Sequence, residues 1–264
     1  MPQNPSITIM FPFLNDWGTV GSLVALAVAT AQKYTDDWEV VIVNDGSILS
    51  NREALGSIVD ILNIKYQKSN IKNKVSNRIR IIDHEKNRGY GGALRSGFAA
   101  ASKDLIFYTD CDAQYDPREL GLLMKEMIPA FSRSGGIRRG EVGMVNGYKI
   151  KRNDPWYRTV AGRLYHHMVK LAFCIPIRDT DCDFRLIRRE VFDKVKLFEN
   201  TGTICTELVK KVDQAGYKIV EVPVHHYWRT SGKSQFFNFG RLFKTGTNLL
   251  SLWWKLIVIR AYDR

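Results

Sequence analysis

The sequence predicts an α/β fold in which a mostly parallel sheet is flanked by helices. Short apolar runs without polar alternation recur in the first half, and such runs are typical of strands buried on both faces. Longer segments of helical character lie between them, and strands that alternate with helices form parallel sheets through right-handed crossovers. The four expected strands are Ile7–Phe11, Trp38–Val43, Ile79–Ile82 and Leu105–Thr109.

The segments between these strands predict helices and one turn. A helix is expected over Val20–Lys33, and the glycine-rich turn Gly89–Gly92 leads into a second helix over Ala93–Ala101. Pro117 predicts the beginning of another helix, because proline is favoured at the first helical position. The polar stretch Lys65–Asn77 interrupts the alternation, and we interpret it as a surface excursion.

The later part of the chain predicts a helix over Ile204–Ala215, a strand over Lys218–Val224 and a C-terminal helix within Phe236–Ile259. In this last segment apolar side chains lie roughly on one helical stripe, which basic residues interrupt. Its longest apolar run is far below the ~20 residues of a transmembrane helix. The pattern favours a basic amphipathic helix at a membrane surface. A helix packed on the core and an oligomer contact are the alternatives.

Two carboxylates follow the strand Leu105–Thr109, where Asp110 and Asp112 stand one residue apart. In an extended stretch, residues two apart point the same way, so both acids can face one cation. The carboxyl ends of parallel strands are also where open α/β sheets bind ligands. Oxygen ligands suit Mg²⁺ or Mn²⁺, which often bridge a protein to a diphosphate. A solvated acidic loop is the alternative interpretation.

Polar residues also follow two other predicted strands. Asn15 and Asp16 lie in the loop after the first strand, and Asp45 follows the second. Such a carboxylate can accept hydrogen bonds from a base or a ribose. Gly89–Gly92 fits neither the P-loop nor the G-x-G-x-x-G pattern, which argues against a P-loop NTPase and an NAD-dependent dehydrogenase. We attribute most of this glycine turn to close packing of a helix on the sheet.

The chain of 264 residues has a formal net charge of +12, and the excess lies in the second half. Residues 1–131 hold 14 Lys and Arg against 15 Asp and Glu, whereas residues 132–264 hold 25 against 12. A basic face can meet nucleic acid, anionic lipid or a phosphorylated substrate. The four cysteines show no C-x-x-C spacing, and no signal peptide is evident, so a reducing cytosol is expected. They are Cys111, Cys174, Cys182 and Cys205.

Several charged side chains of the second half are candidates for acceptor chemistry. The basic group can place an anionic acceptor, although a solvated basic face would explain about half of it. It consists of Lys149, Lys151, Arg152, Arg158 and Arg163. The acidic group could supply a base toward a sugar hydroxyl. It consists of Asp179, Asp181, Asp183 and Glu207. Asp181 or Asp183 can instead anchor a turn, and Glu207 can pair with Lys210 or Lys211 at helical spacing. His225 and His226 are candidates for the metal or for packing.

Six segments together resemble family 2 glycosyltransferases of the GT-A fold, a Rossmann-like α/β architecture. The first four are PFLND from Pro12, VNDGS from Val43, NRGYGGALRSG from Asn87 and DCDAQ from Asp110. Two later ones, DCDFRLIRREVF from Asp181 and EVPVHHYWRTSGKSQFF from Glu221, are similar to the dolichyl- and polyprenyl-phosphate sugar synthases. The resemblance covers nearly the whole chain.

The resemblance implies a set of site residues. Asp16 and Asp45 would hold the base, uracil or guanine, and the ribose. Asp110, Asp112 and Gln114 would hold Mg²⁺ or Mn²⁺ and the diphosphate. The full donor-binding set is Pro12, Asn15, Asp16, Asp45, Gly89, Asp110, Ala113 and Gln114. Asp112 and Arg229, the latter in an R-x-x-G-x-S pattern completed by Gly232 and Ser234, are the expected catalytic residues. The expected acceptor-phosphate residues are Lys149, Arg158, Arg163 and Lys233.

Two departures from the family pattern concern this site. Asp16 stands where the family usually has Glu, which shortens the reach to the base. Many members have Ser-Lys where this chain has Ser234-Gln235, so a lysine role passes to Lys233.

The expected activity is metal-dependent, inverting transfer of a hexose from a GDP- or UDP-sugar to a polyprenyl or dolichyl phosphate. The alternative acceptor is a saccharide hydroxyl in polysaccharide or glycolipid assembly. A nucleic-acid-binding module has no supporting motif, and the D-x-D pair argues against a silent nucleotide-sugar-binding regulator.

The chain divides into a catalytic domain, residues 1–235, and the amphipathic segment, residues 236–264. Within the catalytic domain, residues 1–116 form the nucleotide-binding half and residues 117–235 the acceptor-binding half. We expect a peripheral protein on the cytosolic face of a membrane, either on the lipid surface itself or recruited by a membrane-anchoring partner.

Overall fold

The computed structural model describes residues 4–67, 78–131, 136–151, 167–229 and 239–260. The first half alternates strands and helices. Its elements are β1 (Ile7–Phe13), α1 (Trp17–Ala31), β2 (Trp38–Asn44), α2 (Leu49–Gln67), β3 (Ile79–Asp83), α3 (Tyr90–Ala100) and β4 (Leu105–Thr109). The four strands predicted from the sequence are therefore present, and β4 has the predicted bounds. The long helix α2 was not predicted.

The second half is more irregular. A 3₁₀ turn, η1 (Pro117–Glu119), begins at the predicted proline and leads into α4 (Leu120–Ala130). The remaining elements are β5 (Val142–Lys151), β6 (Phe184–Arg188), α6 (Val191–Lys194), α7 (Ile204–Gln214), β7 (Lys218–His225), α8 (Phe239–Trp253) and a π-helical turn η2 (Trp254–Val258). The predicted helix and strand at α7 and β7 are confirmed to within one residue, whereas β5 and β6 were not predicted.

All seven described strands form one sheet in the order β3-β2-β1-β4-β6-β5-β7. The strands β1 to β4 are parallel, and β6 is antiparallel to both of its neighbours, β4 and β5. The predicted class, a mostly parallel sheet flanked by helices, is confirmed. Because β6 runs in reverse, its amino end lies beside the carboxyl end of β4, where Thr109 pairs with Phe184.

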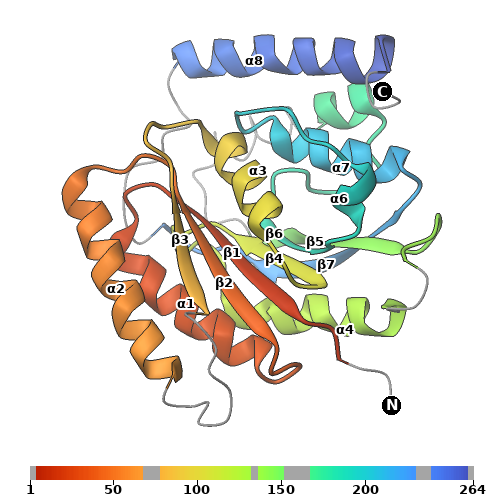
Figure 1. Ribbon diagram of the computed structural model, residues 1–264. Coiled ribbons are helices and arrows are strands. Elements are labelled where there is room, and N and C mark those ends of the chain that lie inside the picture. The colour runs from red at the N-terminus through yellow and green to blue at the C-terminus, as the bar shows by residue number, and fades with distance from the viewer. Residues whose placement is uncertain (1–3, 68–77, 132–135, 152–166, 230–238, 261–264) are drawn as a thin grey trace.

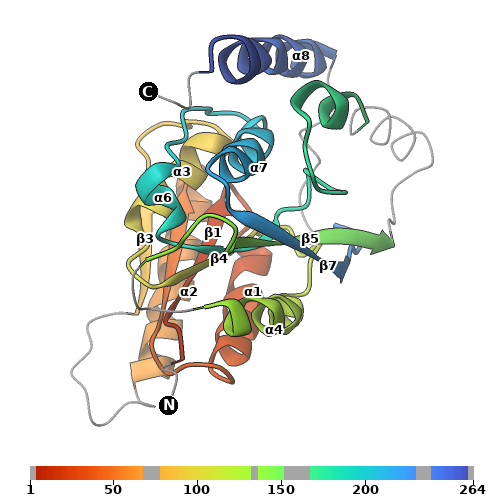
Figure 2. The same ribbon diagram turned by 90° about the vertical axis from the view of Figure 1, so that its right-hand side faces the viewer.

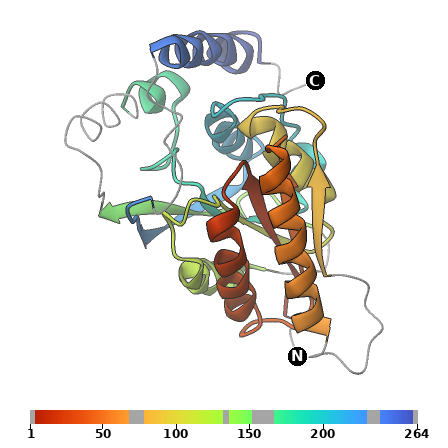
Figure 3. The same cartoon turned by 90° about the vertical axis from the view of Figure 1, so that its left-hand side faces the viewer.

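Helices cover both faces of this sheet (Figures 1 and 2). One core cluster joins the sheet to α1, α2 and α4, and Figure 3 shows α1 and α2 running side by side on that face. The other cluster joins the sheet to α3, α6 and α7, and α8 lies outermost on this second side. Leu252 and Leu256 anchor α8 and η2, since both side chains are fully buried in the second cluster.

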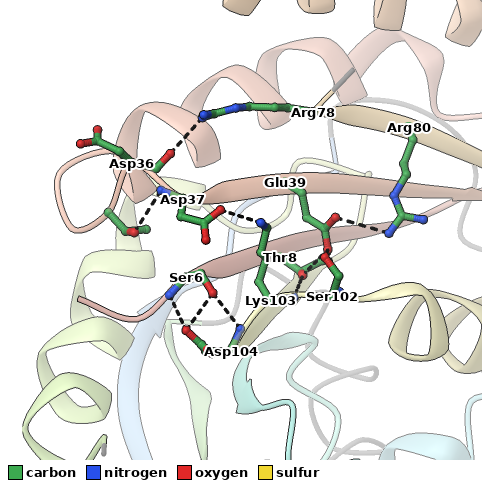
Figure 4. A network of polar contacts seen from close by, with 11 residues as sticks. Ser6, Thr8, Asp36, Asp37, Glu39, Arg78, Arg80, Ser102, Lys103 and Asp104 are labelled. Carbon is green, nitrogen blue, oxygen red and sulfur yellow. Dashed lines mark hydrogen bonds and ion pairs between the residues drawn. The ribbon is translucent and has the colours of Figure 1, made fainter. Parts of the chain in front are cut away.

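A polar network fixes the amino ends of the central strands (Figure 4). The backbone N–H and the hydroxyl of Ser6 donate to Asp104 at 2.9 and 2.8 Å, which joins β1 to the start of β4. Glu39 on β2 accepts hydrogen bonds from the Thr8 hydroxyl at 2.7 Å and from the Ser102 N–H at 2.8 Å. These contacts hold the strands in register at the amino ends, which is the end of the sheet opposite to the predicted site at the carboxyl ends.

Candidate active site

Asp110 leaves the sheet at the carboxyl end of β4, whose five residues are all buried. The hydroxyl of Tyr90 donates to Oδ1 of Asp110 at 2.8 Å. Burial, together with the nearby negative charges of Asp183 and Asp112, raises the pKa of Asp110 well above its usual value. A bound cation would stabilise the ionised carboxylate, because its positive charge would offset both the burial and the repulsion from the neighbouring carboxylates.

Asp112 is paired with Arg229 across the site. The guanidinium Nη2 of Arg229 lies 2.6 Å from Oδ2 of Asp112, whose side chain is 6% exposed, whereas that of Arg229 is 31% exposed. The other carboxylate oxygen accepts the backbone N–H of Gln114 at 3.0 Å. Ala113, between them, has a φ of 60°, a conformation that non-glycine residues rarely adopt and that turns the loop back toward the carboxylate. Burial raises the pKa of Asp112, and Arg229 opposes that rise.

The loop after β1 lies beside this pair. Burial raises the pKa of Asp16, the positive charge of Arg229 opposes this rise, and the negative charge of Asp112 adds to it. The three charged groups are therefore close enough to interact electrostatically. Asn15, with a φ of 64°, accepts the backbone N–H of Ile48 at 3.1 Å and so joins the loops after β1 and β2. The structure therefore brings the charged side chains of Asp16, Asp112 and Arg229 together.

Asp45 follows β2 and is buried in a hydrogen-bonded chain. Its Oδ1 lies 2.7 Å from Nδ1 of His84 and accepts the N–H of Arg88 at 2.8 Å. The other ring nitrogen of His84 lies 2.8 Å from the hydroxyl of Ser96 on α3. Asp45 thus holds the end of β3 against α3 at the edge of the site. The sequence signal for His84 was only its place one residue after β3.

The segment Gly89–Gly92, which we predicted as a turn before a helix, is the start of α3 itself, and it packs against a segment that we did not expect. The backbone N–H of Gly91 donates to the carbonyl of Asn200 at 3.0 Å. A Cβ at Gly91 would lie 2.4 Å from the carbonyl oxygen of Glu199, and one at Gly89, whose φ is 84°, would lie 2.3 Å from that of Asn200. Close packing was the right interpretation, but the partner of these two glycines is the 199–200 backbone. Packing of the helix on the sheet occurs further along, where Gly97 meets Met10 on β1.

Two other expected donor residues, Gln114 and Pro12, also lie at this edge. The side-chain amide of Gln114 donates to the carbonyl of Tyr227 at 3.2 Å, while the Tyr227 N–H donates back to the Gln114 carbonyl at 2.8 Å. This pair of bonds brings the segment that carries Arg229 next to Asp112. Pro12 lies within β1, paired with Val43 of β2.

The predicted acceptor cations are only partly within the described residues. Lys149 is nearly buried, and its ammonium group donates to the carbonyl of Asp181 at 2.8 Å and lies 3.8 Å from Oδ2 of Asp179. Arg158, Arg163 and Lys233 lie outside the described residues, as do Arg152, Gly232 and Ser234.

The carboxylates of the second half have separate environments. Burial raises the pKa of Asp181 to about 6, although Lys149 opposes the rise. Asp179 anchors the local turn by accepting the N–H of Asp181 at 3.1 Å, so the turn anchor lies two residues before Asp181. Asp183 precedes β6 and contributes to the raised pKa values of Asp110 and Asp112. Its Oδ1 lies 3.1 Å from the sulfur of Cys205.

Glu207 is a structural residue of α7. Its carboxylate is fully buried and accepts the backbone N–H groups of Phe198 at 3.0 Å and Glu199 at 2.9 Å. It also lies 2.9 Å from the ammonium group of Lys211, one helical turn later, as the sequence predicted. Glu207 therefore fixes the segment against which the glycine turn packs.

The two histidines at the end of β7 lie away from Asp110 and Asp112. His225 contacts Glu119, and the ring of His226 meets Tyr115 edge-on at 5.3 Å between ring centroids. Within the described ranges, no group of three or more His, Cys, Asp or Glu side chains is arranged to hold a metal ion. Asp110 and Asp112 are the candidate oxygen donors at this edge of the sheet. Two oxygen ligands suit an ion that takes its other ligands from water and a substrate diphosphate.

A family model described as "Glycosyl transferase family 2" matches residues 8–196. Among curated relatives, a glycosyltransferase AglD of Haloferax volcanii is 26% identical over 96% of this chain and 38% of its own length. An undecaprenyl-phosphate 4-deoxy-4-formamido-L-arabinose transferase of Aeromonas hydrophila is 23% identical over 87% of this chain and 62% of its own. The chain therefore spans less than two thirds of the length of either relative.

Solved structures share the fold. One is a glucosyl-3-phosphoglycerate synthase from Mycobacterium tuberculosis in complex with Mn²⁺ and uridine-diphosphate-glucose. It superposes with a TM-score of 0.63 at 15% identity, over 95% of this chain and 78% of that one. A second structure of the same synthase, with Mn²⁺, uridine diphosphate and phosphoglyceric acid, gives a TM-score of 0.62 over 93% and 75%. At this identity the likeness concerns the fold alone.

Proposed function

Because the chain belongs to glycosyl transferase family 2, we propose that it moves a hexose from a nucleoside diphosphate sugar to a polyprenyl phosphate, with a divalent ion as cofactor. The protein is a glycosyltransferase of GT-A architecture. The donor, the acceptor and the ion are the proposed parts. The main observation that supports these proposed parts is the contact between Arg229 and Asp112 at the carboxyl end of β4.

This contact pairs the two kinds of group that a departing diphosphate needs. Asp110 and Asp112 supply oxygen ligands for Mg²⁺ or Mn²⁺, which when bound stabilises the negative charge that develops on the leaving group. Arg229 can form two parallel hydrogen bonds to phosphate oxygens. In the structure its guanidinium is held by Asp112, so we infer that it turns to the diphosphate when the donor binds. Asp16 and Asp45 lie on the neighbouring loops, where the nucleoside would sit.

The proposed reaction exchanges one bond at the anomeric carbon for another. An oxygen of the acceptor phosphate attacks from the face opposite the donor diphosphate, and the bond to the diphosphate breaks, which inverts the anomeric centre. The nucleoside diphosphate leaves with the electron pair of that bond. A phosphate acceptor is anionic near neutral pH and needs no strong general base. It needs cations instead, and we expect Arg158, Arg163 and Lys233 to provide them.

Relatives support a lipid acceptor. The Aeromonas transferase is named for undecaprenyl phosphate, and a dodecaprenyl-phosphate galacturonate synthase of Rhizobium johnstonii is 23% identical over 95% of this chain and 67% of its own length. A polyprenyl tail stays in a membrane, so the enzyme has to work at that surface. Among the described residues, none of the helices is both long and apolar enough to cross a bilayer.

An exposed apolar face offers a peripheral contact. The indole N–H of Trp253 on α8 donates to the carbonyl of Ala172 at 2.9 Å, so residues 167–173, which are helical, lie against α8 (Figure 2). Leu171 is 83% exposed, Leu250 69% and Trp254 55%. The exposed basic residues Lys244 and Arg260 lie along the same helix and its end. We propose that this face rests on anionic lipid at headgroup level.

A second candidate is transfer to a saccharide hydroxyl, which Asp183 favours. A hydroxyl acceptor needs a general base within hydrogen-bond reach. Asp183 is a half-buried carboxylate close enough to Asp110 and Asp112 to raise both of their pKa values. It would be that base, whereas a phosphate acceptor would leave Asp183 without a proton to take.

A product assay separates the two candidates. The protein is incubated with UDP- and GDP-hexoses, Mn²⁺ and either undecaprenyl phosphate in vesicles or a panel of oligosaccharides. The proposal predicts an organic-extractable sugar and one nucleoside diphosphate released for each sugar transferred. Transfer to an oligosaccharide alone would favour the second candidate. Absence of transfer from every donor to either acceptor class would contradict the proposal.

A further inference from the structure

We propose that Tyr90 is a positioning residue that holds the carboxylate of Asp110 in the orientation that the divalent ion requires. The inference rests on the proposed function, because it concerns the ion that Asp110 and Asp112 would share. The sequence alone indicates no role for Tyr90. Its hydroxyl donates to Oδ1 of Asp110 at 2.8 Å. A hydrogen bond at one carboxylate oxygen restrains the orientation of the group, while the other oxygen can face an ion.

The two carboxylates of the site are held by different kinds of partner. Asp112 contacts the cationic guanidinium of Arg229, which an incoming ion has to displace from Oδ2. Asp110 contacts a neutral hydroxyl, which orients the group and leaves its negative charge available. Tyr90 can therefore keep its hydrogen bond when the ion arrives. Orientation by a neutral donor is the usual role of the groups that surround metal ligands.

The surrounding structure fixes Tyr90 as well. Tyr90 is the first residue of α3 and lies between Gly89 and Gly91, whose backbones touch the 199–200 segment. Asn200 binds α3 at two points, since its carbonyl accepts a hydrogen bond from the Gly91 N–H and its side-chain oxygen accepts one from Nη1 of Arg95 at 2.9 Å.

The segment that braces Tyr90 is itself anchored from two sides. Glu207 on α7 accepts the N–H groups of Phe198 and Glu199. On the other side, Asn248 on α8 donates to the hydroxyl of Thr201 at 3.3 Å. Figure 1 shows α3, α7 and α8 stacked on the same side of the sheet. A continuous path of contacts thus leads from α7 and α8 through the glycine turn to Tyr90 and Asp110.

Tyr90→Phe tests the role, because it removes the hydroxyl and keeps the ring. Mn²⁺ is titrated by calorimetry into the full chain in the presence of saturating UDP and, separately, GDP. Loss of a group that orients a metal ligand weakens metal binding by about 10- to 100-fold, and we expect a loss in this range. The affinity for the nucleotide without metal should change by less than about twofold. A general loss of packing would instead weaken nucleotide binding as well. Tyr34→Phe is the matched control, since that hydroxyl contacts the Gly121 carbonyl at 3.4 Å, away from the site.

A second variant tests the brace. Gly91→Ala keeps the Tyr90 hydroxyl, but its Cβ would collide with the backbone of Glu199, so the turn has to shift. It should also weaken Mn²⁺ binding, whereas Gly56→Ala on α2, which has open space around it, should not. If wild type binds Mn²⁺ and Tyr90→Phe binds it equally well, the inference about Tyr90 is wrong and the proposed function stands. If wild type binds no Mn²⁺ with either nucleotide, the metal in the proposed function is wrong.

Discussion

Arg229 and Asp112 are 117 residues apart in the chain, yet their side chains form an ion pair of 2.6 Å between Nη2 and Oδ2. The pair joins the segment after β7 to the loop after β4. If the donor binds here, its diphosphate and the Asp112 carboxylate would both attract the guanidinium of Arg229. We propose that this ion pair is the arrangement without donor and that donor binding separates it.

Replacing Arg229 tests this relationship. Arg229→Ala should lower kcat by about 10²- to 10³-fold, which is the usual effect of removing one preorganised donor to a developing negative charge. Arg229→Lys should retain part of the activity, because a lysine keeps the charge and loses the paired geometry. Arg78→Ala is the control, since Arg78 contacts the carbonyl of Asp36 at the opposite end of the sheet. Wild-type kcat for Arg229→Ala would remove Arg229 from the reaction.

The continuously apolar strands β1, β2 and β4 could be predicted well from the sequence. β4 consists of four apolar or aromatic residues followed by threonine, and all five are buried, so its bounds were evident from the sequence. The D-x-D pair that directly follows it remains a predicted metal site. α2 was not predicted, although its buried positions Leu55, Val59 and Leu62 recur at helical spacing, because the exposed apolar side chains of Ile61 and Ile64 obscure that stripe.

The reversal of β6 could not be predicted from local pattern. Its five residues include two arginines, Arg185 and Arg188, both fully buried. Arg185 is satisfied by hydrogen bonds to Asn146 at 2.7 Å and to the Tyr108 hydroxyl at 2.8 Å. These partners lie 39 and 77 residues away, so the sequence showed only a charged segment. The same limit applies to Tyr90, whose role depends on a tertiary contact with Asp110.

Glu207 should govern stability rather than transfer chemistry. Glu207→Gln removes the charge that faces Lys211 and weakens the acceptor for two N–H groups, and breaking a buried ion pair costs about 3 kcal/mol. Urea denaturation measures the change in the free energy of unfolding. Glu53→Gln, at an exposed position on α2, should leave it nearly unchanged. An unaltered free energy of unfolding together with abolished transfer would show that Glu207 is a catalytic base.

Glu39 makes the stability depend on pH in a defined direction. Burial would raise its pKa, but hydrogen bonds from Ser102 and Thr8 and the charge of Arg80 prevail and lower the pKa below the usual 4.5. A carboxylate with a lowered folded-state pKa contributes stability above its unfolded value, and this contribution is lost as the pH falls through the folded value.

The corresponding variant is Glu39→Gln. Wild type should exceed it in free energy of unfolding near neutral pH, and the difference should shrink as the pH falls below about 4.5. Denaturation series at several pH values measure this difference. Asp60→Asn, at an exposed position on α2, serves as the control. A difference that grows on acidification would contradict the assigned sign.

The apolar face of α8 and residues 167–173 should bind anionic vesicles. Leu171→Glu or Leu250→Glu should weaken cosedimentation by about tenfold each, since burial of a leucine side chain contributes 1.5–3 kcal/mol. Ile61→Glu is a matched control, because Ile61 is 66% exposed on α2, on another face of the molecule. Equal losses for all three variants would mean that vesicle binding follows net charge and does not use this face.

The central claim is that Asp110 and Asp112 bind a divalent ion together with the diphosphate of an activated sugar. Calorimetric titration of UDP- and GDP-hexoses, with and without Mn²⁺, into wild type and Asp112→Asn measures it directly. The account predicts tight binding of at least one donor that requires Mn²⁺ in wild type and is lost in the variant, while both proteins unfold at similar temperatures. Donor binding that is equally strong without Mn²⁺, or that survives in Asp112→Asn, would contradict the claim.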